Sequence, residues 1–566
     1  MHSMGKEERA RSRDWARFVQ ANVFLVLFLG LVPIGYRLSQ PNRAPLPHDV
    51  IGGFPQVLTR IFEATRPRVR TYILGCGGGG GPEARDDEDQ ILQGIRASGE
   101  SPSTIDAALS PFATNVPGTF DVFLVGTEGG GGRTLVLGQA RHAHLTFPTA
   151  ECGNARALAR GAEALVRERL EDAGKFVNGL VPVVYPAYHV TLSMLVEDPS
   201  ERPGLRWEYK GQEGDEIVFA PSSRVGRFFS AMRENVADVT VQTQVLYFSK
   251  LAAHAKRVHQ KGGGGGASNA SFVKPKDLRR FIGLNDNINF GAGLRSNLER
   301  VVQFACFVPA AKHAPVVVAT TRKAAKRRLN GSAGGAATGF IVPRWGGVSI
   351  LNMDPAETEA MSEASFEAFE GLFLAHARAI FGFDEDLNFP RRGEGPASTD
   401  GGGVEGVVRL RRPDDDDVVG GWEIDAAVIR RINDHAESIA GKVSSVLKIA
   451  KKMSNIIIHQ EIGDLIDQAV ERLTVATERL EGDRALVAAL RELRKGYVMA
   501  EEANQDPSMV TQEFFPLEHL LAVYCPLILP LVLPFLFGVR EAYARQWKRY
   551  RGDPCSDSED EKEKEE

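Results

Sequence analysis

Hydrophobic residues form two long runs, one near each end of the chain. The first run is Phe18–Tyr36, and the second, Leu520–Val539, contains no charged residue. As helices, these runs would be about 28 and 30 Å long, which matches a bilayer hydrocarbon core of about 30 Å. We therefore predict transmembrane helices at residues 18–36 and 517–539.

The first run could instead be the apolar core of a cleaved signal peptide. A small-x-small cleavage site does not follow it, since the chain continues as Arg37-Leu38-Ser39-Gln40-Pro41. This favours an uncleaved anchor.

Charged residues beside the two runs predict their orientation. Five basic residues precede the first run and five follow the second, and positively charged flanks stay in the cytosol. Residues 1–17 and 540–566 are therefore expected in the cytosol, and residues 37–516 are expected to form one translocated region. The acidic tail contains Lys562 and Lys564, three and five positions from the C-terminus, which fits a KxKxx retrieval signal.

Three prolines, Pro526, Pro530 and Pro534, recur every four residues in the second run. Each removes a helical hydrogen bond and bends the helix. The shared face of these prolines either meets partner helices or forms a kink without a partner.

Strand-like and helix-like segments alternate over residues 37–392, which predicts a mixed α/β layer fold. Expected strands are Val122–Gly126, Thr134–Gln139, Tyr188–Val196, Val239–Phe248, Val302–Val308 and Phe340–Leu351. Expected helices are Asn154–Ala173, Val225–Val236 and Ser365–Phe381.

The composition changes after residue 392. Residues 393–421 are rich in Gly, Pro and Asp and indicate a linker. From 422 to 516 apolar residues recur every three or four positions, with breaks near Ser454–Ile458 and at Gly482. This predicts two or three long helices packed as an antiparallel hairpin that leads into the second span.

The residues that could carry chemistry do not form a recognisable catalytic motif. The chain has neither a GxSxG sequence nor a P-loop. His142 and His144 could share a strand face as metal ligands, but a third ligand is not evident nearby. A dyad of histidine with Cys152 or Cys306 is not supported by spacing. We therefore predict no catalytic, cofactor or metal site.

The five cysteines allow at most one bridge among Cys76, Cys152 and Cys306. Cys306 lies in an apolar run and is expected to be a buried free thiol. Asn269 and Asn330 begin glycosylation sequons in loops rich in Gly or Ala. The basic cluster between Arg322 and Arg328 is expected to be a solvated loop, because a lumenal location and a net charge of −5 argue against nucleic acid.

Several blocks resemble the PIG-S family in order and spacing. They include Tyr188–Pro199, Gln303–Pro315 and Phe514–Pro534 with its three prolines. The most specific block is Val342–Asp354, which contains Pro343, Arg344, Trp345, Gly346 and Gly347.

This resemblance implies a non-catalytic subunit of the GPI transamidase in the endoplasmic-reticulum membrane. That complex attaches a preassembled GPI anchor to the C-terminus of a precursor after signal cleavage. The cysteine-protease-like subunit PIG-K carries the nucleophile, and PIG-T, PIG-U and the GPAA subunit are the other implied partners. The alternatives are a membrane-anchored lumenal enzyme acting on glycolipid or peptide, and a generic membrane tether.

Overall fold

The computed structural model describes most of the chain between residues 44 and 507, together with short pieces within 15–26 and 526–551. The main described ranges are 44–76, 91–93, 95, 102–127, 133–138, 140–172, 185–210, 215–248, 255–261, 267–274, 276–277, 298–329, 337–342, 345–383, 409–410, 418–452 and 458–507. The predicted spans at 18–36 and 517–539 lie largely outside these residues. Within the described part of the chain, no helix combines the length and apolarity that crossing a membrane requires.

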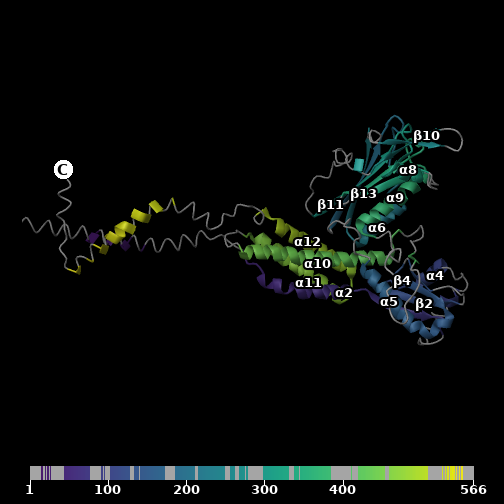
Figure 1. The fold of residues 1–566 in the computed structure, drawn as a ribbon. Coiled ribbons are helices and arrows are strands. Elements are labelled where there is room, and N and C mark those ends of the chain that lie inside the picture. The colour runs from purple at the N-terminus through teal and green to yellow at the C-terminus, as the bar shows by residue number, and fades with distance from the viewer. Residues whose placement is uncertain are drawn as a thin grey trace, which may run out of the picture. The chain divides into compact units, whose positions relative to one another are not determined.

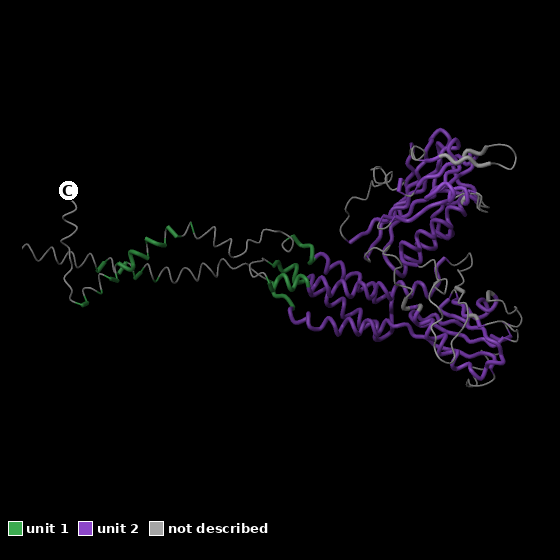
Figure 2. Tube along the Cα trace, in the orientation of Figure 1, with its two compact units in different colours: residues 1–47, 445–464, 503–566 green, residues 48–444, 465–502 purple. Residues whose placement is uncertain are grey.

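The chain divides into two compact units (Figure 2). One contains residues 1–47, 445–464 and 503–566, and the other contains residues 48–444 and 465–502. The larger unit holds two five-stranded sheets, which confirms the predicted mixed α/β region followed by long helices.

The first sheet has the strand order β1-β2-β4-β3-β15. Neighbouring strands are parallel except for β3 and β4, which are antiparallel. The bounds are β1 (Arg68–Leu74), β2 (Thr119–Thr127), β3 (Thr134–Leu137), β4 (His142–Pro148) and β15 (Arg409–Leu410).

Helices cover both faces of this sheet. Apolar residues of β2 and β4 pack on one face against Leu158, Ala162 and Val166 of α5 (Ala155–Asp172), and on the other against Ile105 and Leu109 of α4 (Pro102–Leu109). Burial on both faces explains the nearly continuous apolar sequence of β2.

A disulfide joins Cys76, just after β1, to Cys152. Cys152 lies in the 3-10 helix η3 (Thr149–Asn154), after β4. Cys306 is a free, buried thiol. The expectation for Cys306 is confirmed, and of the three possible pairings the structure contains Cys76–Cys152.

The second sheet has the order β13-β14-β11-β5-β8. Its strands are parallel except for β13, which is antiparallel to β14. The bounds are β5 (Ala187–Val196), β8 (Asp238–Tyr247), β11 (Glu299–Val308), β13 (Ala337–Val342) and β14 (Gly346–Leu351). The expected single strand Phe340–Leu351 was wrong, because the chain reverses before Gly346 and forms two strands.

Helix α9 (Glu363–Phe381) packs over β13 and β14, beside α6 (Arg224–Asn235). Phe366, Phe369 and Phe373 of this helix are buried, and Leu372 is half-buried. Ser362 caps the start of α9 by accepting a hydrogen bond from the Ser365 amide, and Gly382 ends the helix with a φ of 85°.

Smaller elements complete the larger unit. The basic cluster expected as a loop forms helix α8 (Arg322–Leu329), because Ala325 and Leu329 pack against a neighbouring strand pair and give the segment a buried face. Short sheets are formed by β12-β10-β9 and by β6-β7. The remaining bounds are β6 (Glu208–Lys210), β7 (Asp215–Ile217), β9 (Lys256–Lys261), β10 (Ala267–Val273), β12 (Val316–Val318), η1 (His48–Gly52) and η2 (Ser110–Phe112).

The predicted long helices are α10 (Gly421–Lys452), α11 (Gln460–Glu481) and α12 (Leu486–Gln505), and helix α2 (Phe54–Thr65) lies beside them (Figure 1). Arg472 and Arg479 of α11 both pair with Glu492 of α12, next to the turn that joins these helices. Helices α11 and α12 therefore form a hairpin, and its break falls near Gly482, as the periodicity predicts.

Candidate functional site

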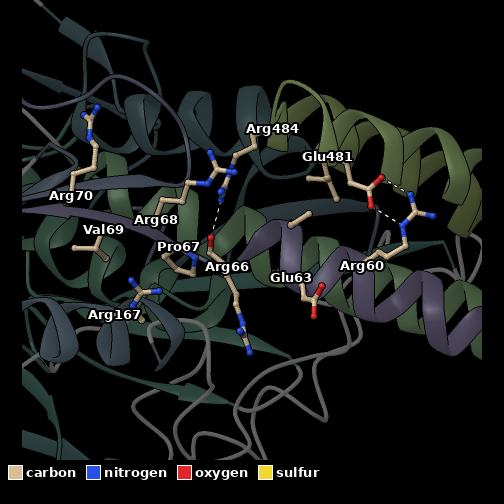
Figure 3. Close-up of a pocket in the computed structure, with 12 residues that line it drawn as sticks. Arg60, Glu63, Arg66, Pro67, Arg68, Val69, Arg70, Arg167, Glu481 and Arg484 are labelled. Atoms are coloured by element: carbon tan, nitrogen blue, oxygen red, sulfur yellow. Dashed lines mark hydrogen bonds and ion pairs between the residues drawn. The ribbon is translucent and has the colours of Figure 1, made fainter.

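A pocket of about 650 Å³ lies where α2, β1, α5 and the turn between α11 and α12 meet (Figure 3). Six arginines and two glutamates contribute to its lining: Arg60, Arg66, Arg68, Arg70, Arg167, Arg484, Glu63 and Glu481. We call this site the arginine pocket. Arg68 and Arg70 reach it because β1 is an edge strand whose alternate side chains are exposed.

Several arginines of the pocket are held by acceptors. Arg60 makes a two-pronged ion pair with Glu481. Arg70 donates to both carboxylate oxygens of Asp121, at 2.7 and 3.0 Å. Nη2 of Arg484 donates to the backbone carbonyl of Arg66 at 2.8 Å (Figure 3).

Arg66 and Arg68 differ from Arg60 and Arg70, since neither of their side chains has an ion-pair partner among the described residues. Burial, and then the positive charge of Arg68, lower the pKa of Arg484. The arginine pocket thus holds excess positive charge, partly in repulsion with itself. Guanidinium groups bind phosphate and carboxylate through paired hydrogen bonds, so the pocket can hold an anion.

A second cluster lies between the first sheet and α4 and consists of Asp106, His142 and His144. Asp106 belongs to α4, and the two histidines are alternate residues of β4, as predicted from their spacing. One ligand atom from each residue lies within 4.8 Å of the other two. Sequence reasoning missed Asp106, because it lies on a separate helix and the pattern around it does not reveal that helix.

All three side chains of this cluster are buried, with 4% of Asp106 and 0% of each histidine exposed. Nε2 of His142 lies 2.9 Å from Oδ1 of Asp106. Burial, and then the neighbouring His142, lower the pKa of His144 to about 4, so His144 is neutral near pH 7. Neutral imidazole and carboxylate are metal ligands.

The glycines of the Pro343–Gly347 block are required by backbone geometry. Gly346 has a φ of 149°, and a Cβ there would lie 1.7 Å from the carbonyl oxygen of Gln303. A Cβ on Gly347 would meet the Phe304 ring at 2.8 Å. These contacts let β14 approach β11 closely. Trp345 is partly buried and packs against the hydrophobic core beside β11 and β14. Pro343 and Arg344 lie outside the described residues.

The other predicted site residues are scattered. Asn269 lies in β10, opposite His259 of β9, and not in the expected loop. Asn330, Lys562 and Lys564 lie outside the described residues. Pro526, Pro530 and Pro534 are helical and exposed.

The two cysteines considered for a dyad with histidine, Cys152 and Cys306, are unsuited to nucleophilic chemistry. Cys152 is in the disulfide. Burial raises the pKa of Cys306 to about 12, so its thiol stays protonated near pH 7.

Comparison with known proteins gives one family. The family model for phosphatidylinositol-glycan biosynthesis class S protein matches residues 181–549. The chain is similar to the GPI-anchor transamidase component PIGS of Bos taurus, with 24% identity over 371 residues, and to that of Homo sapiens, with 24% identity over 370 residues. These matches cover 64% of this chain and only 58% of the length of each relative.

Proposed function

The chain belongs to the PIG-S family, and on that basis we propose that it is a non-catalytic subunit of a GPI transamidase. The observation that carries the proposal is the family match over residues 181–549, which includes the second sheet and the three long helices. The similar relatives are named as components of that transamidase. In this role the chain supports transfer of a preassembled GPI anchor to the C-terminus of precursors.

The chain acts as a scaffold, and a PIG-K-like cysteine protease supplies the nucleophile. The raised pKa of Cys306 and the disulfide at Cys152 support this division of labour. PIG-T, PIG-U and GPAA subunits are the further partners. The α/β region at 37–392 and the helices of 422–516 provide lumenal docking surfaces, joined by a linker at 393–421.

Two helices at 18–36 and 517–539 anchor this scaffold in the endoplasmic-reticulum membrane, with both termini in the cytosol. Exposed apolar side chains of Val23, Val26, Leu533 and Phe537 suit contact with lipid. A disulfide is typical of an oxidising compartment such as the lumen. The face of Pro526, Pro530 and Pro534 contacts partner helices, and Lys562 and Lys564 serve retrieval.

Purification of the tagged full-length chain in mild detergent tests this proposal. We expect a PIG-K-like protease to co-purify, and cells that lack the chain to lose GPI-anchored proteins from their surface. Recovery of membrane proteins without that protease would instead support the generic tether.

A substitution distinguishes the scaffold from the lumenal enzyme. Cys306→Ala should restore GPI attachment in the deficient cells to the level reached with the unchanged chain, because a buried protonated thiol takes no part in the reaction. Loss of attachment by a variant that still folds and still binds the protease would contradict a non-catalytic role.

A further inference from the structure

We propose that Asp106, His142 and His144 bind one Zn²⁺ ion between the first sheet and α4. The three residues lie before residue 181, where the family match begins. The proposal therefore does not depend on the transamidase role.

The first argument is that these buried polar atoms are unsatisfied. Within the described ranges, Oδ1 of Asp106 and both ring nitrogens of His142 and His144 have no hydrogen-bond partner. Leaving a buried polar group without a partner costs about 1–3 kcal/mol, and more for a charged group. Together, these unsatisfied atoms would lower the stability of the folded chain considerably.

The second argument is the geometry of the contact between Asp106 and His142. Their nearest polar atoms are 2.9 Å apart, yet the pair lacks hydrogen-bond geometry. Around a tetrahedral Zn²⁺ with bonds of about 2.0–2.2 Å, ligand atoms are roughly 3.4 Å apart. The three ligand atoms, all within 4.8 Å of one another, need only small side-chain rotations to reach that arrangement.

The backbone around the cluster leaves room for these side chains to converge. A Cβ on Gly138 would lie 2.3 Å from Oδ1 of Asp106 and 2.4 Å from Nε2 of His142. Only glycine at this position allows the carboxylate and the imidazole to approach each other beside the strand end. The Phe123 ring packs edge-on against His142 and limits its rotation.

The donor set identifies the metal. Two imidazoles and one carboxylate suit Zn²⁺, whereas Mg²⁺ and Ca²⁺ prefer oxygen ligands alone. The ion would bind one nitrogen of each ring and one carboxylate oxygen, which gives three of the five unsatisfied atoms a partner. It would also tie α4 to β4, so its role is structural.

Metal analysis of the purified full-length chain in detergent tests the site. After incubation with ZnCl₂ and removal of excess metal, we expect one Zn²⁺ per chain. His144→Ala and Asp106→Asn should lose most of it. His376→Asn should retain it, because His376 is a buried histidine of α9 that is not part of the cluster. A chelator should lower the thermal unfolding midpoint of the unchanged chain.

Two results would overturn the proposal. One is the absence of bound zinc from the folded, unchanged chain, which would mean that Asp106 and His142 form a buried pair without a metal. The other is equal zinc content in the unchanged chain and both ligand variants. If the variants fail to fold, binding of Co²⁺ to the unchanged chain tests the proposal instead. Co²⁺ in a four-coordinate site of nitrogen and oxygen ligands absorbs visible light strongly. Addition of ZnCl₂ should abolish this absorption, because both ions compete for the same site.

Discussion

Arg66, Arg68 and Arg484 line the arginine pocket without a carboxylate partner among the described residues. Arg60, Arg70 and Arg167 each pair with a carboxylate, so their charges are already compensated. Arg68 instead disfavours the charged form of Arg484. An anion placed between these side chains would relieve that repulsion.

We therefore expect inorganic phosphate to stabilise the chain. At ten times its dissociation constant, a ligand that binds only the folded state adds RT ln 11, about 1.4 kcal/mol, to the free energy of unfolding. Arg68→Gln should remove most of this gain. The measurement is the thermal midpoint in phosphate against chloride at constant ionic strength, because chloride screens exposed charges equally.

Arg206→Gln is the matched control, since Arg206 is exposed and does not line the pocket. Its response to phosphate should equal that of the unchanged chain. An equal phosphate response in Arg68→Gln would show that the arginine pocket does not bind the anion.

Individual site residues were only partly predictable from the sequence. The spacing of His142 and His144 placed both histidines on one strand face, but without an evident third ligand it led to the prediction of no metal site. Asp106 could not be found, because its partners come from pairing between distant segments that a local pattern does not record. The requirement for glycine at 346 likewise depends on the carbonyl of Gln303 in another strand.

At the scale of elements, the long helices pack closely at Gly496. A Cβ there would lie 3.1 Å from Cβ of Arg472 and 3.2 Å from Cδ1 of Ile439, on α11 and α10 respectively. Gly441 of α10 offers the opposite case, since no atom lies within 4 Å of its Cβ position.

Gly496→Leu should destabilise the packed helices by about 1–3 kcal/mol, because the added side chain forces neighbours apart. Gly441→Ala should stabilise them by about 0.5–1 kcal/mol, because alanine loses less conformational entropy in a helix. Hydrogen exchange of the α12 amides measures the effect locally. Faster exchange in both variants, or in neither, would contradict this account of the packing.

Elements with strong periodicity were predicted well, and those with weak periodicity were not. The helices after residue 421 and the parallel strands of the second sheet follow apolar patterns that their burial explains. Helix α8 was mistaken for a loop, since its buried face is only Ala325 and Leu329 among basic residues. The two strands β13 and β14 were merged, although Pro343 and Gly346 are residue types that commonly mark a turn.

At the scale of the whole molecule, the cysteines offer a way to test the proposed membrane topology. Cys76 and Cys152 are oxidised, and Cys306 is buried. Cys555 belongs to the tail at 540–566, which the proposed topology assigns to the cytosol. A thiol reagent that does not cross membranes can therefore distinguish the two sides.

In sealed microsomes we expect an impermeant maleimide to label Cys555 from outside, and Cys555→Ser to abolish this labelling. Cys76 and Cys152 should react only after detergent, denaturant and reductant are added together. External protease should trim the tails and spare residues 37–516. Digestion of that middle region in intact vesicles would contradict the proposed orientation.

Pairing of Arg60 in α2 with Glu481 at the end of α11 joins positions 421 residues apart in the chain. A ribosome adding roughly 5–20 residues per second would complete α11 roughly 20–80 s after α2 has been made. During that interval the apolar face of α2, with Phe54 and Ile61, lacks its final neighbours in the nascent chain. This family member should therefore need chaperone protection of α2 until translation is almost finished.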